Sequence, residues 1–204
     1  MISQRQMGPH ELPELVWIPQ PGEAHYDPST ETLRLIAGPY VDWANDSQGI
    51  EYGHEASCLG FPVLGDFSLS ARVRVEGSRS TFDAGALAVW IGPDRWAKLC
   101  FEWSPAAEPM VVSVVTNDWS DDCNSVVVAP DGVRLRVSRC ESAWAFHYSV
   151  DGIVWRFVRL FRLHSADVAH VGFLAQAPVG DGCTALFDEI RYEDKPPSDL
   201  RGGG

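Results

Sequence analysis

The sequence predicts an all-β protein, a sandwich of two antiparallel sheets with jelly-roll topology. Apolar and polar residues alternate over several short runs, which is the period of a strand. Turn-forming residues separate these runs at hairpin-like intervals. Two central runs are almost wholly apolar, as expected of strands that are covered on both faces, and they favour stacked sheets over a closed barrel.

The alternating runs lie at residues 33–37, 67–75 and 133–137, and the apolar runs at 84–91 and 110–115. The turn signals between them are Gly65-Asp66, Gly92-Pro93-Asp94, Pro130-Asp131-Gly132, Asp151-Gly152 and Gly180-Asp181-Gly182. No long stretch has a helical period, and only residues 164–169 are expected to form a helical turn.

The length of 204 residues, with 45% hydrophobic and 22% charged residues, is typical of one globular domain with a sizeable core. We expect a single concanavalin A-like β-sandwich domain over residues 11–194. Residues 195–204 are rich in proline and glycine and are expected to form a flexible C-terminal tail. No internal repeat or low-complexity linker is visible.

The chain is acidic, with 16 Lys and Arg against 28 Asp and Glu and a formal charge of -12. Nucleic acids and anionic membranes are therefore not expected as partners. The first ten residues contain no apolar run of a signal peptide, and no stretch of about 18 apolar residues occurs. These features predict a cytoplasmic protein, and they leave the oligomeric state open.

Five cysteines are an odd number, and they are scattered without a CxxC pair. This pattern predicts free thiols and no disulfide. No histidine has the spacing of an HExxH motif or of a catalytic triad, so histidine-based chemistry is not favoured. The pattern predicts no metal site and no cofactor.

The strand expected at residues 95–104 has two contrasting faces. One face carries Trp96, Lys98, Cys100 and Glu102, and the other carries Ala97, Leu99, Phe101 and Trp103. We expect the second set in the core and the first set along a concave groove, with Lys98 and Glu102 as catalytic candidates. Lys98 is expected to lower the pKa of Glu102. An ordinary ion pair on a solvated face is the alternative.

Residues 116–122 bring carboxylates, an amide, hydroxyls and an indole together directly after a buried run. Loops on rigid sheets are frequent positions for binding residues. Asp118 is therefore a third catalytic candidate, and Thr116 and Trp119 are candidate ligand contacts. A Ca²⁺ ion near Asp118, Asp121 and Asp122 stays open, although the spacing does not match an EF-hand and an Asx-turn is favoured.

Eight tryptophans are many for this length, and four of them stand among polar neighbours: Trp43, Trp96, Trp119 and Trp155. Indoles stack on sugar rings and donate a hydrogen bond. For any single tryptophan a place in the core is the commoner outcome. We therefore expect a cluster of them to form the binding surface.

An ordered series of motifs covers most of the chain. It comprises Asp42-Trp43, Ala84-Gly85, Trp96-x-Lys98-x-x-x-Glu102, Val114-Val115-Thr116-x-Asp118-Trp119-Ser120, Tyr148-Ser149-x-Asp151-Gly152-x-x-Trp155-x-x-x-Arg159, and Val171-Gly172 before Ala177-Pro178. This series resembles the DUF1349 family, which is related to the yeast "regulation of enolase" protein and belongs to the concanavalin A-like lectin/glucanase superfamily. Two departures are the adjacent Asp42-Trp43 and the Asn117 in the loop before Asp118.

The resemblance implies a jelly-roll sandwich whose concave face binds carbohydrate in relatives. It implies groove positions at Trp43, Trp96, Lys98, Glu102, Thr116, Asp118, Trp119 and Arg159. Trp155 is added as a ligand contact because it stands among polar neighbours.

We expect a non-catalytic protein that recognises a carbohydrate or a small polar metabolite in a concave groove lined by Trp, Lys and Glu. The first alternative is an enzyme, a hydrolase, isomerase or cyclase, that uses Glu102 and an aspartate as acid and base on a sugar or a biosynthetic intermediate. The lack of an ExDxxE-like motif disfavours a glycosidase. The second alternative, implied only by the yeast relative, is a regulatory partner of a metabolic enzyme.

Overall fold

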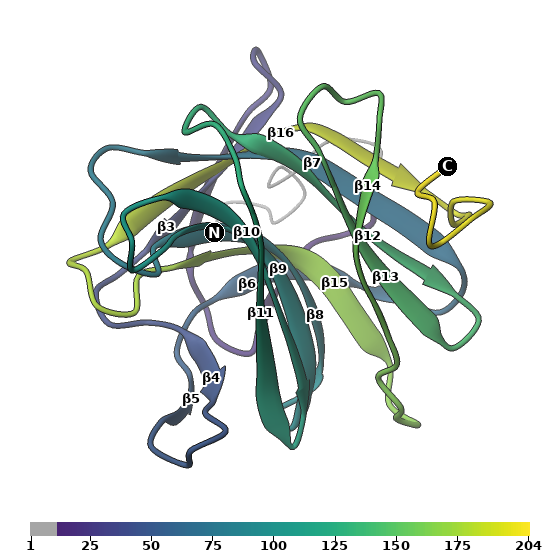
Figure 1. The fold of residues 1–204 in the computed structure, drawn as a ribbon, viewed down its shortest axis with the longest axis horizontal. Coiled ribbons are helices and arrows are strands. Elements are labelled where there is room, and N and C mark those ends of the chain that lie inside the picture. Colours follow the sequence, from purple (N-terminus) through teal and green to yellow (C-terminus); the bar gives the residue numbers. More distant parts are fainter. Residues whose placement is uncertain (1–11) are drawn as a thin grey trace.

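A computed structural model describes residues 12–204 as two seven-stranded antiparallel sheets packed face to face (Figure 1). The strands are β1 (Val16–Ile18), β2 (Glu23–Asp27), β3 (Thr32–Ala37), β4 (Trp43–Asn45), β5 (Tyr52–His54), β6 (Cys58–Val63), β7 (Phe67–Glu76), β8 (Ala84–Gly92), β9 (Arg95–Trp103), β10 (Pro109–Asn117), β11 (Trp119–Val127), β12 (Val133–Cys140), β13 (Ala143–Ser149), β14 (Arg156–Phe161), β15 (Ala169–Gln176) and β16 (Cys183–Glu193). The prediction of an all-β, two-sheet sandwich is confirmed. The predicted domain start at residue 11 and the first ten residues lie outside the described part.

The first sheet has the strand order β1-β6-β15-β8-β9-β10-β11, and the second has the order β14-β13-β12-β7-β16-β3-β2. Many neighbouring strands are far apart in the sequence, because the chain passes repeatedly from one sheet to the other. A separate two-stranded hairpin, β4–β5, is visible in Figure 1 beside β11.

The core between the sheets is built from the inward-facing residues of the alternating runs. Leu33 and Leu35 on β3 and Leu135 on β12 are fully covered. Phe173 on β15 and Phe187 on β16 join the two sheets, with ring centroids 5.1 Å apart. A strand period therefore places these side chains correctly, because every second residue points into the sandwich.

The run Ala84 to Val89 is continuously buried because the outer face of β8 is covered as well. Ala84, Ala86 and Ala88 belong to a second apolar cluster, which also contains Trp43 of the hairpin. The expectation that this central run is covered on both faces is thus confirmed. The hairpin β4–β5 covers the outer face.

Two segments differ from the expected pattern. Residues 164–169 form bends that lead into β15, so the predicted helical turn is wrong. Residues 195–204, expected to be a flexible tail, lie against the second sheet: Arg136 donates to the Gly203 carbonyl at 2.6 Å, and His147 Nε2 lies 2.9 Å from the Leu200 carbonyl. Residues 12–204 contain no helix long and apolar enough to cross a membrane.

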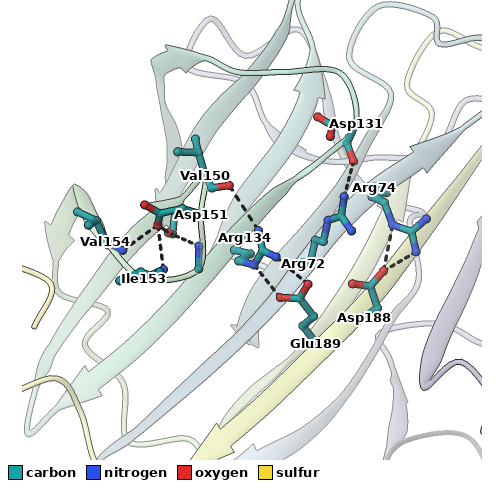
Figure 2. Close-up of polar contacts among 12 residues, drawn as sticks. Arg72, Arg74, Asp131, Arg134, Val150, Asp151, Ile153, Val154, Asp188 and Glu189 are labelled. Atoms are coloured by element: carbon teal, nitrogen blue, oxygen red, sulfur yellow. Dashed lines mark hydrogen bonds and ion pairs between the residues drawn. The ribbon is translucent and has the colours of Figure 1, made fainter.

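Charged side chains on the outer face of the second sheet are largely paired (Figure 2). Arg134 binds Glu189 through two hydrogen bonds of 2.7 Å, and Arg74 pairs with Asp188. The carboxylate of Asp151 accepts two backbone N–H groups of its own turn. The charges of these groups are therefore already balanced by protein partners.

Candidate ligand-binding site

The hairpin β4–β5 covers part of the outer face of the first sheet with an aromatic cluster. Trp43 on β4 is 1% exposed, and its ring centroid lies 4.7 Å from that of Trp90 and 5.8 Å from that of Trp96. Trp96 is fully covered too. Both indoles therefore belong to an apolar layer between hairpin and sheet, and neither presents an open ring face for stacking.

Asn45 at the end of β4 fixes the hairpin to the sheet. Its Nδ2 donates to the carbonyls of Pro93 at 3.1 Å and Asp118 at 3.0 Å, and its Oδ1 accepts from Trp96 Nε1 at 3.1 Å. These bonds join the hairpin to the turn between β8 and β9 and to the turn between β10 and β11. The sequence showed no signal for this role.

A pocket of about 400 Å³ lies beside the hairpin on the uncovered part of the first sheet. Its lining comes from the hairpin, from β9, β10 and β11 and from two loops. It comprises Asp42, Trp43, Ala44, Asn45, Asp46, Ser47, Gln48, Glu51, Phe82, Lys98, Glu102, Val112, Val114, Ser120, Asp122, Asn124, Gln176, Pro178 and Val179. A pocket of this size is suited to a small ligand.

Lys98 is a fixed charge in the floor of this pocket. Its ammonium group donates to Asp42 Oδ1 at 2.5 Å, to the Trp43 carbonyl at 2.9 Å and to Gln176 Oε1 at 2.9 Å. Burial, the largest single effect, opposes its charge, but the combined attraction of nearby acidic groups, with Asp42 first, raises the pKa of Lys98 above its usual value. All three donors are used, so Lys98 organises the pocket and has no free proton for a ligand.

Glu102 lies on the same face of β9 and has no hydrogen-bond partner or ion pair among residues 12–204. The residue is 7% exposed and lines the pocket. Burial raises its pKa to about 7, and the carboxylates of Asp42 and Asp122 add to the effect, while Lys98 acts in the opposite direction. Lys98 acts to lower the pKa of Glu102, as expected, but the effect of burial is larger, so the net shift is upward.

Asp122 on β11 is the second carboxylate that lines the pocket without a protein partner among the described residues. Burial raises its pKa as well, with further contributions from Asp42 and Asp121. The β10 residues Val112 and Val114 lie between β9 and β11 and give the floor between the two acids an apolar surface. The pocket therefore combines free acceptor groups, Glu102 and Asp122 among them, with aliphatic contacts.

Two loops form an apolar rim at one side of the pocket. Phe82, 39% exposed, comes from the loop before β8, and Pro178 and Val179 come from the loop after β15. The loops touch at Gly180, where a Cβ would lie only 2.9 Å from the Cβ of Ser80. Only a residue without a side chain fits there, so Gly180 allows the two loops that form the rim to pack closely against each other.

Three residues of the predicted loop site lie outside the lining. Asp118 lies in the turn before β11, exposed and paired with Arg95 at 2.9 Å. Trp119 is 56% exposed and does not line the pocket. Thr116 is buried and shares a 2.9 Å hydrogen bond with Ser120 Oγ.

Two other predicted contacts belong to the second sheet and its connections. Trp155 precedes β14 and lies under Arg136, with 4.4 Å between the guanidinium carbon and the ring centroid. Arg159 on β14 pairs with Asp121 at 2.8 Å. Of the predicted site residues, the structure thus brings Trp43, Lys98 and Glu102 together at one pocket.

The far end of β9 also differs from expectation. Leu99 and Phe101 are in the core, but Trp103 is half-buried and outside it, with Arg79 5.4 Å from its ring centroid. Among residues 12–204 no group of three or more His, Cys, Asp or Glu side chains is arranged to hold a metal ion.

The structure adds Phe82, Asp122 and Gln176 to the pocket. Asp122 was visible in the sequence only as part of an acidic loop. Phe82 is a lone aromatic residue between polar neighbours, and Gln176 follows an apolar strand, so neither has a local pattern that indicates a site.

The fold and the pocket together define a concanavalin A-like β-sandwich with a ligand-sized cavity on the outer face of one sheet. The profile of the family described as "Protein of unknown function (DUF1349)" matches residues 17–195, and the chain belongs to this family. No curated protein matches in sequence.

Solved structures share the fold. A functionally unknown protein from Saccharomyces cerevisiae superposes with a TM-score of 0.78 and 23% identity, covering 88% of this chain and 95% of the yeast chain. A xylan beta-1,4-xylosidase from Bacillus halodurans has a TM-score of 0.64 and 16% identity, with 80% of this chain and 33% of the enzyme covered. The GH43B protein of a Bacteroides ovatus xyloglucan locus gives a TM-score of 0.63 and 14% identity, covering 80% and 32%. This chain thus corresponds to about one third of either of these two longer proteins.

Proposed function

We propose that the protein binds a neutral carbohydrate, or a polyhydroxyl compound of similar size, in the pocket of the first sheet. The observation that carries this proposal is the largely buried carboxyl group of Glu102, which has no protein partner among the described residues and lines a cavity of about 400 Å³ together with the exposed carboxylate of Asp122. Buried polar groups are nearly always hydrogen-bonded in folded proteins. Hydroxyl groups of a ligand are donors that satisfy such acceptors.

The charge of the pocket favours a neutral ligand over an anionic one. Lys98 and Asp42 balance each other, which leaves Glu102 and Asp122 without a nearby free cation. The formal charge of -12 adds a long-range repulsion of anions. Phosphorylated sugars are therefore disfavoured.

Two of the structural neighbours support the carbohydrate class. The names of the Bacillus halodurans and Bacteroides ovatus proteins refer to xylan and xyloglucan. Because this chain spans only one third of each, the likeness supports a sugar-binding module more than the activity of the whole enzyme. Xylose-containing oligosaccharides are the first ligands to test.

Isothermal titration calorimetry with xylobiose, glucose and glucose 6-phosphate tests the proposal. We expect the wild-type protein to bind a neutral sugar and to bind the phosphate ester more weakly. Hydrogen bonds to charged groups contribute about 1.5 to 3 kcal/mol, so Glu102→Gln and Asp122→Asn should each weaken binding about 10-fold or more. Glu108→Gln, an exposed position outside the pocket, is the matched control.

Equal affinity of the wild-type protein and both pocket variants for a bound sugar would contradict this assignment. Preferential binding of glucose 6-phosphate would contradict the charge argument.

Proton transfer by Glu102 is a second candidate function. A carboxyl group with a pKa near 7 is half-protonated at neutral pH and suits a general acid, with Asp122 as a second carboxylate in the same pocket. Release of nitrophenol from a nitrophenyl xyloside would reveal such activity. Glu102→Gln should abolish it, whereas activity that persists in this variant excludes Glu102 as the acid.

We also propose a cytoplasmic location. The support is chemical: all five cysteines are free thiols in the structure, as expected of a protein in a reducing compartment.

A further inference from the structure

The tryptophans expected to form a stacking surface do not offer an open ring to the pocket. Of the two aromatic residues that line it, Trp43 is 1% exposed and packs against Trp90 and Trp96. The other, Phe82, is 39% exposed. The ring of Phe82 is therefore the aromatic surface that a ligand in this pocket meets.

Phe82 has a backbone conformation that bulky residues seldom adopt. Its φ is +68°, in the left-handed region that favours glycine. Its N–H donates to the Trp103 carbonyl at 2.7 Å, and its carbonyl accepts from Gln176 Nε2 at 3.0 Å. Strained residues of this kind persist where the surroundings hold them, and they concentrate at functional sites.

The contact that holds Phe82 continues into the floor of the pocket. Gln176 donates to Phe82 and accepts from Lys98, and Lys98 donates to Asp42. A chain of hydrogen bonds thus runs from the backbone carbonyl of Phe82 to the charged pair beneath. It links three segments that are far apart in the sequence, and it assigns Gln176 a positioning role.

The loop that carries Phe82 is fixed from its other side as well. Asp83 Oδ2 accepts the N–H of Ser80 at 2.8 Å, and the Asp83 carbonyl accepts from Arg79 at 2.8 Å. Arg79 in turn lies 4.5 Å from the ring centroid of Phe101. The ring is therefore presented from an anchored loop, which reduces the entropy lost when a ligand binds.

We propose that Phe82 is the specificity-determining residue of the pocket and that it stacks on the apolar face of a saccharide ring. The hydroxyl groups of that ring are directed to Glu102 and Asp122, and Gln176 holds the Phe82 backbone in place. This inference rests on the proposed carbohydrate binding, and it adds a preference for cyclic sugars over open-chain polyols.

The test compares Phe82→Gly with Phe82→Leu, using xylobiose as the cyclic probe and xylitol as the open-chain probe in calorimetry. Both variants remove the ring, but only glycine relieves the left-handed backbone. We expect both to bind xylobiose about two- to tenfold more weakly, the loss typical of one aromatic contact. Xylitol should show no such loss, and Phe82→Tyr should bind xylobiose like the wild-type protein.

Melting temperatures separate this role from a structural one. If the ring of Phe82 serves binding and not the core, Phe82→Gly should melt at the same temperature as the wild-type protein or at a higher one, because glycine relieves the left-handed backbone. Phe82→Leu should melt at the same temperature as the wild-type protein or at a lower one. A clear loss of stability in Phe82→Gly would assign the ring to the core and overturn the proposal.

The binding measurements distinguish a failure of the proposed role of Phe82 from a failure of the proposed carbohydrate binding. Xylobiose binding that Glu102→Gln weakens and Phe82→Gly leaves unchanged would overturn the role of Phe82 alone. No detectable sugar binding by the wild-type protein would overturn both.

Discussion

Glu102 and Lys98 are neighbours on one face of β9, yet only Lys98 has a close acidic partner. Asp42, from the segment before β4, lies 2.5 Å from the ammonium group. Glu102 keeps an unpaired carboxyl group in a largely buried place, and burial raises its pKa to about 7. Which of the two groups is free depends on the residues that contact it in the folded protein, and not on the spacing of Lys98 and Glu102 along β9.

The raised pKa of Glu102 makes the stability of the protein depend on pH. The folded protein binds the Glu102 proton more tightly than the unfolded chain does, with a pKa of about 7 against 4.5. The resulting stability is full below pH 4.5 and is lost as the pH rises through 7, by about 3 kcal/mol. Glu102→Gln should not show this pH-dependent loss of stability, because glutamine does not titrate.

Chemical denaturation at pH 5 and pH 8 checks this expectation. The unfolding free energy of the wild-type protein should fall between pH 5 and pH 8. The stability of Glu102→Gln relative to the wild-type protein should therefore rise by about 3 kcal/mol over this range. The same difference at both pH values would show that Glu102 does not titrate in this range. Glu108→Gln should show no such shift, because that side chain is exposed.

The hairpin β4–β5 is the element that turns an ordinary sheet face into a pocket. It buries Trp43, Trp90 and Trp96 at one end of β8 and β9 and leaves the other end open. It also supplies Ala44, Asp46 and Ser47 as one wall of the cavity. Loss of its attachment should therefore affect both stability and ligand binding.

Asn45→Ala should detach this hairpin. The change removes the partners of His54 Nε2 and of the Asp118 carbonyl, and it leaves Trp96 Nε1 and the Pro93 carbonyl with only their bond to each other. A buried group left without a partner costs about 1 to 3 kcal/mol, so we expect a loss of roughly 2 to 3 kcal/mol. Hydrogen exchange should speed up in β4 and β5 first.

Asn117→Ala is the control for this change, because its exposed amide makes only one long contact of 3.5 Å. Equal stability of Asn45→Ala and Asn117→Ala would mean that the hairpin is held by its aromatic residues alone.

At the scale of the whole molecule, the two sheets bury the cysteines unequally. Cys58, Cys100 and Cys183 are buried, Cys140 is partly covered and Cys123 is exposed on the edge strand β11. Burial raises the pKa of Cys183 to about 12 and that of Cys58 still further. Thiolate is the reactive form, so a buried and protonated thiol reacts slowly.

Alkylation of the native protein followed by mass spectrometry should find one rapidly modified thiol, Cys123. The three buried cysteines should react only after unfolding, and all five should then be modified without a reducing agent. A stoichiometric disulfide would contradict both the free thiols and the proposed cytoplasmic location. Cys123→Ser should abolish the rapid phase.

The two outer faces of the sandwich also differ in chemistry. On the second sheet, arginines such as Arg134 are paired with acids, and residues 198–204 cover part of the surface. On the first sheet, Glu102 and Asp122 have no protein partner among the described residues. The unpaired and largely buried carboxyl group of Glu102 directs the search for a ligand to the first sheet.

The strands, the two-sheet architecture and much of the core could be predicted from the sequence, because alternation is a local property of each strand. Leu33, Leu35 and Leu135 are buried as their period requires. The same alternation correctly placed Lys98 and Glu102 together on one face. It also put Trp96 on that face, but it could not show that a hairpin covers this indole.

Only the tertiary structure decided which side chains meet at the pocket. Asp42 and Lys98 are 56 residues apart, and Phe82 and Gln176 are 94 apart, so no local pattern records their contacts. Such contacts depend on how strands pair and loops pack once the chain has folded, and the same strand period is compatible with many pairings. The sequence therefore determined the faces of the strands by itself, whereas long-range packing decided which acid is free, which indoles are buried and which ring lines the pocket.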